Sequence, residues 1–161
     1  MSMERARSWL AQRGLEDRII EFSVSSATVA LAAQALGCEE AHIAKTLSFD
    51  VHGKTVLVIA AGDAKVDNPK FKAFFGTKAK MLSFDEVEPR VGHAVGGVCP
   101  FGVNEGVKKY LDESLWRFET VYPAAGNAAS AVRMTPDELY AACDADGRVD
   151  VCKGWRMEEH K

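Results

Sequence analysis

The sequence has no long apolar run, no paired cysteines and no strong charge of either sign. None of its apolar stretches approaches the ~20 residues that a membrane-spanning helix needs. The N-terminal segment, residues 1–14, mixes charged and apolar side chains and has no signal-peptide hydrophobic core. These absences predict a cytoplasmic protein without a membrane partner.

Metal-binding and cofactor motifs are absent as well. The four cysteines form no C-x-x-C pair, and the four histidines lack the spacing of metal ligands. We therefore expect no metal and reduced thiols. The chain contains neither G-x-G-x-x-G nor G-x-x-x-x-G-K-[ST], so we expect no nucleotide cofactor, and no cofactor of any other kind.

The net charge of −3 argues against a DNA-binding protein. One local exception is a basic run of five lysines within sixteen residues, interrupted by a single acid, Asp67. A solvated helix face would explain such a run, and so would a footprint for an RNA backbone. The lysines are Lys65, Lys70, Lys72, Lys78 and Lys80.

The length of 161 residues predicts one domain, residues 1–161, which is large enough to bury a core. Periodicity, caps and turn residues predict helices over 3–13, 28–37, 69–76, 84–91 and 135–143. They predict strands over 18–23, 43–51, 54–61, 79–82, 107–111, 117–123, 130–134 and 148–155. The capping residues are Ser25 or Ser26, Asp67 or Asn68, Ser83, and Thr135 with Glu138.

Two of these strands, 43–51 and 54–61, are joined by His52 and Gly53, which are typical of a two-residue hairpin turn. Because this hairpin interrupts the alternation of strands and helices, we predict an α/β (α+β) single domain with a mixed sheet. The helix over 69–76 carries Phe71, Phe74 and Phe75 on one face, which we interpret as core.

Two features carry possible chemistry. The segment GGVCPFG, residues 96–102, can hold peptide N–H groups in fixed directions, as an anion or an ester oxyanion requires. A tight turn between two strands would have the same composition. Lys45 shares a strand face with Ile43, Leu47 and Phe49, so its ammonium must reach an edge or meet an anion.

Six segments in the same order resemble the YbaK/prolyl-tRNA-synthetase-associated domain family, whose members hydrolyse mischarged aminoacyl-tRNA. The resemblance runs from about Phe22 to Leu139 and covers most of the chain. The segments are SSATVALAAQALG (25–37), IAKTL (43–47), VLVIAAGDAKVD (56–67), GGVCPFG (96–102), YLDESL (110–115) and GNAASAVRMTPDEL (126–139). The family implies a curved mixed sheet that is partly barrel-like and flanked by helices.

The resemblance implies a freestanding, trans-acting aminoacyl-tRNA deacylase that recognises the acceptor end of a tRNA(Pro)-type substrate. It implies a small acyl group such as Ala, Cys, Ser or Thr, and prolyl-tRNA synthetase as a partner. The chain departs from the cysteinyl-tRNA(Pro) deacylase branch at His93, where that branch has tyrosine, and at Ala131, where it has aspartate. Alanine, serine or threonine is therefore as good a candidate acyl group as cysteine.

The resemblance also implies the site residues. The catalytic set is Lys45, Gly97, Val98 and Cys99, with the loop backbone stabilising the carbonyl oxygen and Lys45 binding a phosphate or carbonyl. The family uses a positioned water and the substrate's own groups. Substrate-binding positions are Ser26, Thr28, Thr46, His93, Gly96, Pro100, Asp112, Gly126, Asn127 and Ser130. Capping or turn formation alone would also explain Ser26, Thr28 and Asp112.

Two alternatives stay open. The chain could be a non-catalytic module that binds tRNA or a synthetase with the same fold. It could also be a small-molecule esterase or amidase with Cys99 as nucleophile, which would need a neighbouring base such as His93. The family has varied small residues at the Cys99 position, which disfavours the nucleophile.

Overall fold

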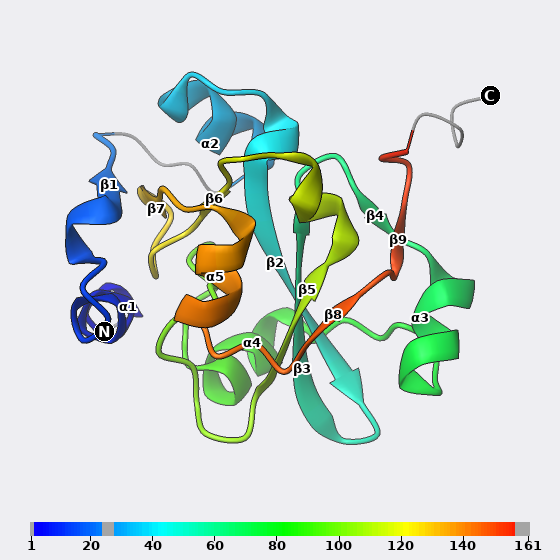
Figure 1. The fold of residues 1–161 in the computed structure, drawn as a ribbon. Coiled ribbons are helices and arrows are strands. Elements are labelled where there is room, and N and C mark those ends of the chain that lie inside the picture. The colour runs from blue at the N-terminus through cyan, green and yellow to red at the C-terminus, as the bar shows by residue number, and fades with distance from the viewer. Residues whose placement is uncertain (1, 24–27, 157–161) are drawn as a thin grey trace.

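The structure is a computed structural model that describes residues 2–23 and 28–156 (Figure 1). Its helices are α1 (Ser2–Ala11), α2 (Val29–Leu36), α3 (Asn68–Phe75), α4 (Phe84–Val91) and α5 (Pro136–Ala142). Short 3-10 helices are η1 (Glu16–Arg18), η2 (Glu40–His42) and η3 (Glu113–Arg117). The strands are β1 (Ile19–Glu21), β2 (Ile43–Val51), β3 (Lys54–Ala61), β4 (Lys65–Val66), β5 (Lys108–Asp112), β6 (Tyr122–Pro123), β7 (Ser130–Val132), β8 (Gly147–Val149) and β9 (Cys152–Lys153).

A mixed sheet of five strands forms the centre, in the order β6-β2-β3-β5-β8. Strands β2 and β3 are antiparallel, whereas β6, β5 and β8 each run parallel to the strand beside them. Strands β1 and β7 form a separate antiparallel pair, as do β4 and β9. The curved, half-barrel sheet with flanking helices confirms the predicted fold class.

The β2–β3 hairpin confirms the prediction from His52 and Gly53. Val51 pairs with Lys54, and the two turn residues have φ values of 52° and 84°. Positive φ at both positions is what a two-residue hairpin turn of type I′ requires. The alternation along β2 therefore places Lys45 opposite Ala60 and Thr46 opposite Ile59, on the two different faces of the sheet.

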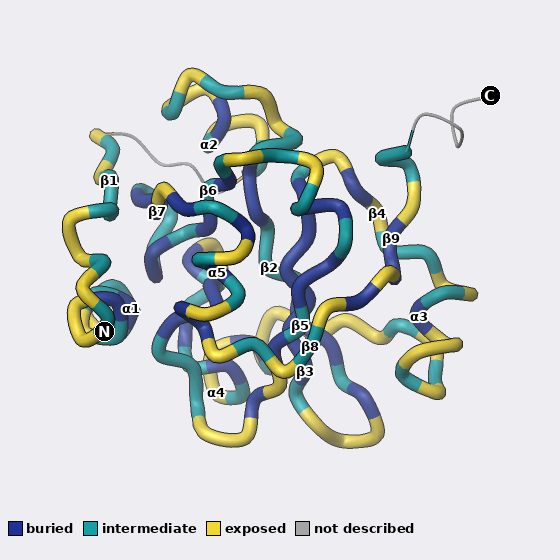
Figure 2. Tube along the Cα trace, viewed as in Figure 1, coloured by how far each residue is buried: buried dark blue, intermediate teal, exposed yellow. Residues whose placement is uncertain are grey.

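The sheet is covered on both faces. Every residue of β3 from Val56 to Ala61 is buried, as Figure 2 shows along the middle of the molecule. On one face, Phe49 of β2 packs against Phe71 of α3, with 4.9 Å between the centres of the two rings. Buried residues of α1 and α5, including Leu10 and Leu139, belong to the same core. No helix among the residues described here is long and apolar enough to cross a membrane.

Most predicted helix caps are confirmed. Asp67 accepts a hydrogen bond from Lys70 N, and Ser83 and Thr135 each form a capping box. The cap of α2 was predicted wrongly, because Thr28 Oγ1 accepts from Leu31 N at 3.1 Å and so fills that position. Ser25 and Ser26, the predicted caps, lie outside the described residues.

Further sequence predictions need correction. The strand expected over 148–155 is divided into β8 and β9, which belong to different sheets. Phe74 is 53% exposed and is not a core residue, because Phe71 and Phe75 already occupy the buried side of α3. The strand expected over 117–123 is reduced to β6, since Arg117 ends η3 and its guanidinium binds the Asp63 carboxylate. The strand expected over 79–82 contributes a single bridge, between Met81 and Phe49.

Candidate active site

A cavity of about 440 Å³ opens along the outer edge of β2. Its walls come from the start of α2, from β2, from the segment between Met81 and Val87, from the glycine loop (residues 92–102) and from the segment between Tyr122 and Ala131. Segments far apart in the sequence thus form one site. The predicted site residues among its lining are Thr28, Lys45, Thr46, Gly96, Val98, Asn127 and Ser130.

The edge of β2 is open where the cavity lies. At one end of the strand, Ile43 and Ala44 pair with β6. At the other end, Ser48 O accepts from Leu82 N at 3.0 Å, and Asp50 N donates to Lys80 O at 2.8 Å. Thr46 lies between these two pairings, so the cavity occupies the gap that they leave in the sheet edge.

Lys45 lines this cavity, and its ammonium is held by carbonyl oxygens of the β3–β4 turn. Nζ donates to Gly62 O at 3.3 Å and to Ala64 O. Gly62 in turn lies directly against Val29 of α2, because a Cβ at Gly62 would be 2.7 Å from Val29 Cγ1. Burial lowers the pKa of the Lys45 ammonium from its ordinary value. An ammonium has three N–H donors, so one remains for a ligand.

The glycine loop brings Gly96 and Val98 to the cavity. Gly96 has a φ of 94°, a conformation that glycine adopts without strain. The N–H of Gly97 is already used, since it donates to Ala94 O at 3.0 Å. Among the hydrogen bonds of the described residues, none uses the N–H of Val98. The N–H of Gly96 is likewise unused among the described residues, so Gly96 and Val98 are the two loop residues at the cavity whose amides are available to a ligand.

Gly97 joins the two loops that the sequence predicted as substrate-binding. A Cβ at Gly97 would lie 2.5 Å from Gly126 O and 2.6 Å from Asn127 Cα. Only glycine allows this close approach of two backbones. Asn127 Oδ1 accepts from Ala129 N at 2.9 Å, which fixes the second loop.

Polar groups inside the cavity are few. Thr46 Oγ1 is buried and has no hydrogen-bond partner among the described residues. An unsatisfied buried hydroxyl costs about 1–3 kcal/mol, which a bound ligand could recover. Ser130 Oγ donates to Asn127 O at 3.5 Å. The rest of the lining is largely aliphatic, with small residues at Ala32, Ala44, Ala124 and Ala131.

His93 and Cys99 belong to the glycine loop, but both are buried and neither is part of the cavity lining. His93 Nε2 is 2.6 Å from Phe101 O, so this nitrogen carries the proton and donates. Cys99 Sγ lies 3.6 Å from the same nitrogen. Burial lowers the pKa of His93 and raises the pKa of Cys99 to about 12. This pair holds the loop, and its thiol is protonated at neutral pH. Pro100 is buried beside it.

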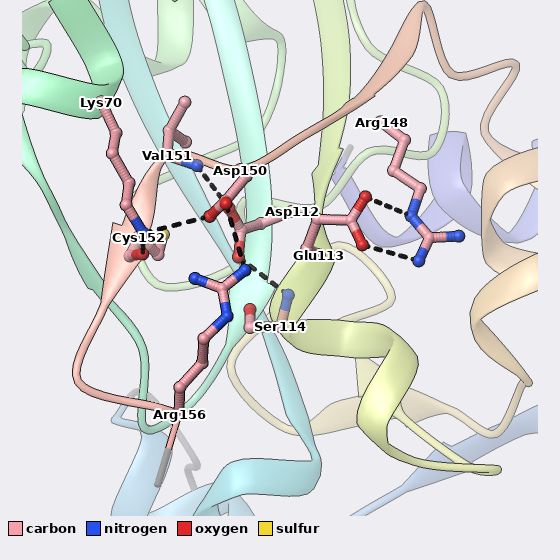
Figure 3. A network of polar contacts seen from close by, with 9 residues as sticks. All are labelled: Lys70, Asp112, Glu113, Ser114, Arg148, Asp150, Val151, Cys152 and Arg156. Carbon is pink, nitrogen blue, oxygen red and sulfur yellow. Dashed lines mark hydrogen bonds and ion pairs between the residues drawn. The ribbon is translucent and has the colours of Figure 1, made fainter. Parts of the chain in front are cut away.

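The side chain of Asp112 is also used for hydrogen bonds within the protein. Its two carboxylate oxygens accept from Ser114 N and from Val151 N, both at 2.9 Å (Figure 3). The side chain is completely buried and does not line the cavity. Asp112 therefore joins β5 and η3 to the segment that leads into β9. Of the remaining predicted site residues, Gly126 contacts Gly97, and Ser26 lies outside the described residues.

Several lining residues were not anticipated from the sequence. Tyr122 and Ala124 belong to the edge strand β6 and to the residues after it, and Met81, Phe84 and Val95 surround the mouth. Each is an isolated apolar or aromatic residue at the start of an element or in a loop, where no periodic pattern marks it. No three His, Cys, Asp or Glu side chains in the described ranges gather as metal ligands.

Comparisons with known proteins agree with this fold. A family model described as the aminoacyl-tRNA editing domain matches residues 24–142. The chain is 47% identical to the uncharacterised protein YwhH of Bacillus subtilis (strain 168) over 156 residues, which cover 96% of this chain and 99% of YwhH. It is also 31% identical to a proline–tRNA ligase of Bacillus cytotoxicus over 81 residues, which cover 50% of this chain and 14% of the ligase.

Among solved structures, the chain matches a crystal structure described as a candidate trans-editing enzyme for prolyl-tRNA synthetase. The two superpose with a TM-score of 0.85 and 32% identity, over 95% of this chain and 98% of that one. Since the family model spans most of the sequence and these relatives agree with it, this chain belongs to the aminoacyl-tRNA editing domain family.

Proposed function

We propose that the protein is a trans-acting aminoacyl-tRNA deacylase that hydrolyses the ester of a mischarged tRNA. The observation that carries this proposal is the convergence of Lys45 and the glycine loop on one cavity. These two parts are about fifty residues apart in the sequence, and each supplies a group that ester hydrolysis needs.

Hydrolysis requires a water oxygen to add to the ester carbonyl and the bond to the ribose oxygen to break. The negative charge that develops on the carbonyl oxygen needs fixed donors. The unused N–H of Val98 can provide one such donor from the loop. The remaining N–H of Lys45 can bind the carbonyl oxygen or a phosphate of the RNA end.

Among the described residues that line the cavity, none carries a carboxylate, an imidazole or a thiol, and Lys45 and Tyr122 are the ones with ionisable side chains. The residues present thus favour a mechanism in which the cavity orients a water and the substrate, and in which the ribose oxygen receives the proton that the water gives up. Cys99 is buried and does not line the cavity, which argues against the esterase alternative with Cys99 as nucleophile.

The substrate we propose is a tRNA(Pro)-type molecule that carries a small amino acid such as Ala, Ser, Thr or Cys. The similarity to a proline–tRNA ligase and to a candidate trans-editing enzyme for prolyl-tRNA synthetase supports the choice of tRNA and makes that synthetase the proposed partner.

A panel of mischarged tRNAs tests the proposal. Purified protein should hydrolyse at least one small aminoacyl-tRNA(Pro) well above the spontaneous rate, and correctly charged prolyl-tRNA(Pro) much more slowly. Binding of tRNA without hydrolysis of any member of the panel would instead support the non-catalytic module.

A further inference from the structure

The mouth of the cavity carries an exposed apolar rim made of Met81, Phe84 and Val95. The exposed fractions of these side chains are 58%, 75% and 48%. In the described part of the chain, five large apolar side chains are exposed, and three of them line this one cavity. Exposed apolar side chains that are gathered at one place, unlike single scattered ones, are typical of a binding site.

The rim is presented by ordered structure. Phe84 is the first residue of α4 and lies within the Ser83–Glu86 capping box. Met81 forms a bridge with Phe49 of β2. Val95 belongs to the glycine loop, next to Gly96. The backbone therefore brings all three residues to the cavity that Lys45 and Val98 line.

We propose that this rim, with Phe84 at its centre, is a stacking platform for an unpaired nucleobase at the 3′ end of an RNA. The inference rests on the proposed function, because an ester held between Lys45 and Val98 must leave the cavity through this mouth. The first groups of the polymer outside are nucleobases, whose flat faces pack well on aromatic and aliphatic side chains.

The lysines on one side of the rim suit the phosphates of an RNA partner. Lys78 and Lys80 are exposed and directly precede Met81 in the chain. On α4, Glu86 is already bound to Ser83 N and to Arg90, whereas Asp85 and Glu88 are exposed acidic neighbours of Phe84. Phosphates that follow a stacked base are thus expected on the lysine side of the mouth.

The test measures binding of a short single-stranded RNA ending in CCA, by fluorescence anisotropy, alongside deacylation of a mischarged tRNA. Phe84→Ala should weaken RNA binding about fivefold to a hundredfold and raise KM to a similar extent, with little change in kcat. Phe84→Trp should restore binding, since it keeps an aromatic face. Phe74→Ala is the matched control, because Phe74 is also an exposed aromatic residue but does not line the cavity.

Two results would overturn the platform. If Phe84→Ala binds RNA as tightly as Phe74→Ala while deacylation proceeds, the result contradicts the stacking platform but not the proposed deacylase. If Phe84→Ala leaves RNA binding intact but abolishes binding to prolyl-tRNA synthetase, the rim is a protein interface. Absence of deacylation by the wild-type protein, together with Phe84-dependent RNA binding, would contradict the proposed reaction and leave the platform standing.

Discussion

Arg5 of α1 donates a hydrogen bond from Nη1 to Gly92 O at 2.9 Å and so ties the N-terminal helix to the glycine loop. Nη2 of the same guanidinium donates to Asn104 Oδ1 at 3.1 Å, just beyond the end of that loop. Gly102 lies directly against the Arg5 backbone, because a Cβ there would be 2.7 Å from Arg5 O. One residue outside the family-matched region thus restrains both ends of the loop that lines the cavity.

Replacing Arg5 should therefore impair deacylation through the loop. We expect Arg5→Ala to lower kcat about tenfold or more, because losing charged hydrogen bonds worth about 1.5–3 kcal/mol lets the Val98 amide move. Arg7→Ala is the control, since Arg7 on the same helix pairs with the exposed Glu21. Kinetics are measured at a temperature at which circular dichroism shows both variants folded. Equal kcat values for the two variants would contradict this role of Arg5.

Gly97→Ala should separate the two loops of the site. Its Cβ would overlap Gly126 O, so the glycine loop or the 126–130 segment has to shift. We expect deacylation to fall by about two orders of magnitude, since a misplacement of about 1 Å is costly to catalysis. Gly106→Ala is the control. It places alanine at a positive φ, which costs stability, but the new Cβ has open space around it. A Gly97→Ala enzyme as active as Gly106→Ala would show that the close approach has no role.

The thiols should not take part in the reaction. Burial raises the pKa of Cys99 and of Cys143 to about 12, and it raises that of Cys152 as well. Cys38 is the one cysteine of the four that is partly exposed. Iodoacetamide at pH 8 should label Cys38 alone in the folded protein, by peptide mass mapping, and leave deacylation intact. Labelling of Cys99 with loss of activity would instead support Cys99 as the nucleophile.

His93 should make stability depend on pH. Because burial lowers its pKa in the folded state, the unfolded chain binds the extra proton first, below its ordinary pKa of about 6.5. The free energy of unfolding should therefore fall between pH 7 and 5, by at most ~1.4 kcal/mol per pH unit. His93→Gln should remove this slope, as urea unfolding at each pH would show. An equal slope in both proteins would show that other titratable groups cause the pH dependence of stability.

Local signals in the sequence predicted the main elements correctly. The hairpin at His52 and Gly53, and the capping boxes at Ser83 and Thr135, depend on residues a few positions apart, so the pattern alone identifies them. The short strand β6 was overestimated, because its length is limited by the side-chain contacts of η3, which no local pattern encodes.

The site was only partly predictable for the same reason. Lys45 and the glycine loop were identified from composition and resemblance, and the structure places them on one cavity. The sequence could not show that Arg5 reaches Gly92, or that the Asp112 carboxylate is consumed by backbone amides 2 and 39 residues away. An exposed aromatic residue such as Phe84 follows no burial periodicity, so only its position at the mouth reveals it.

Single-turnover deacylation of the preferred mischarged tRNA by Lys45→Ala tests the central claim most directly. We predict a rate about a hundredfold or more below wild type, because a fixed donor to the reacting ester or its phosphate is lost. Lys65→Ala, which removes an exposed lysine from the neighbouring strand β4, should stay within about twofold of wild type. A Lys45→Ala protein that is folded and hydrolyses the ester at the wild-type rate would contradict the account.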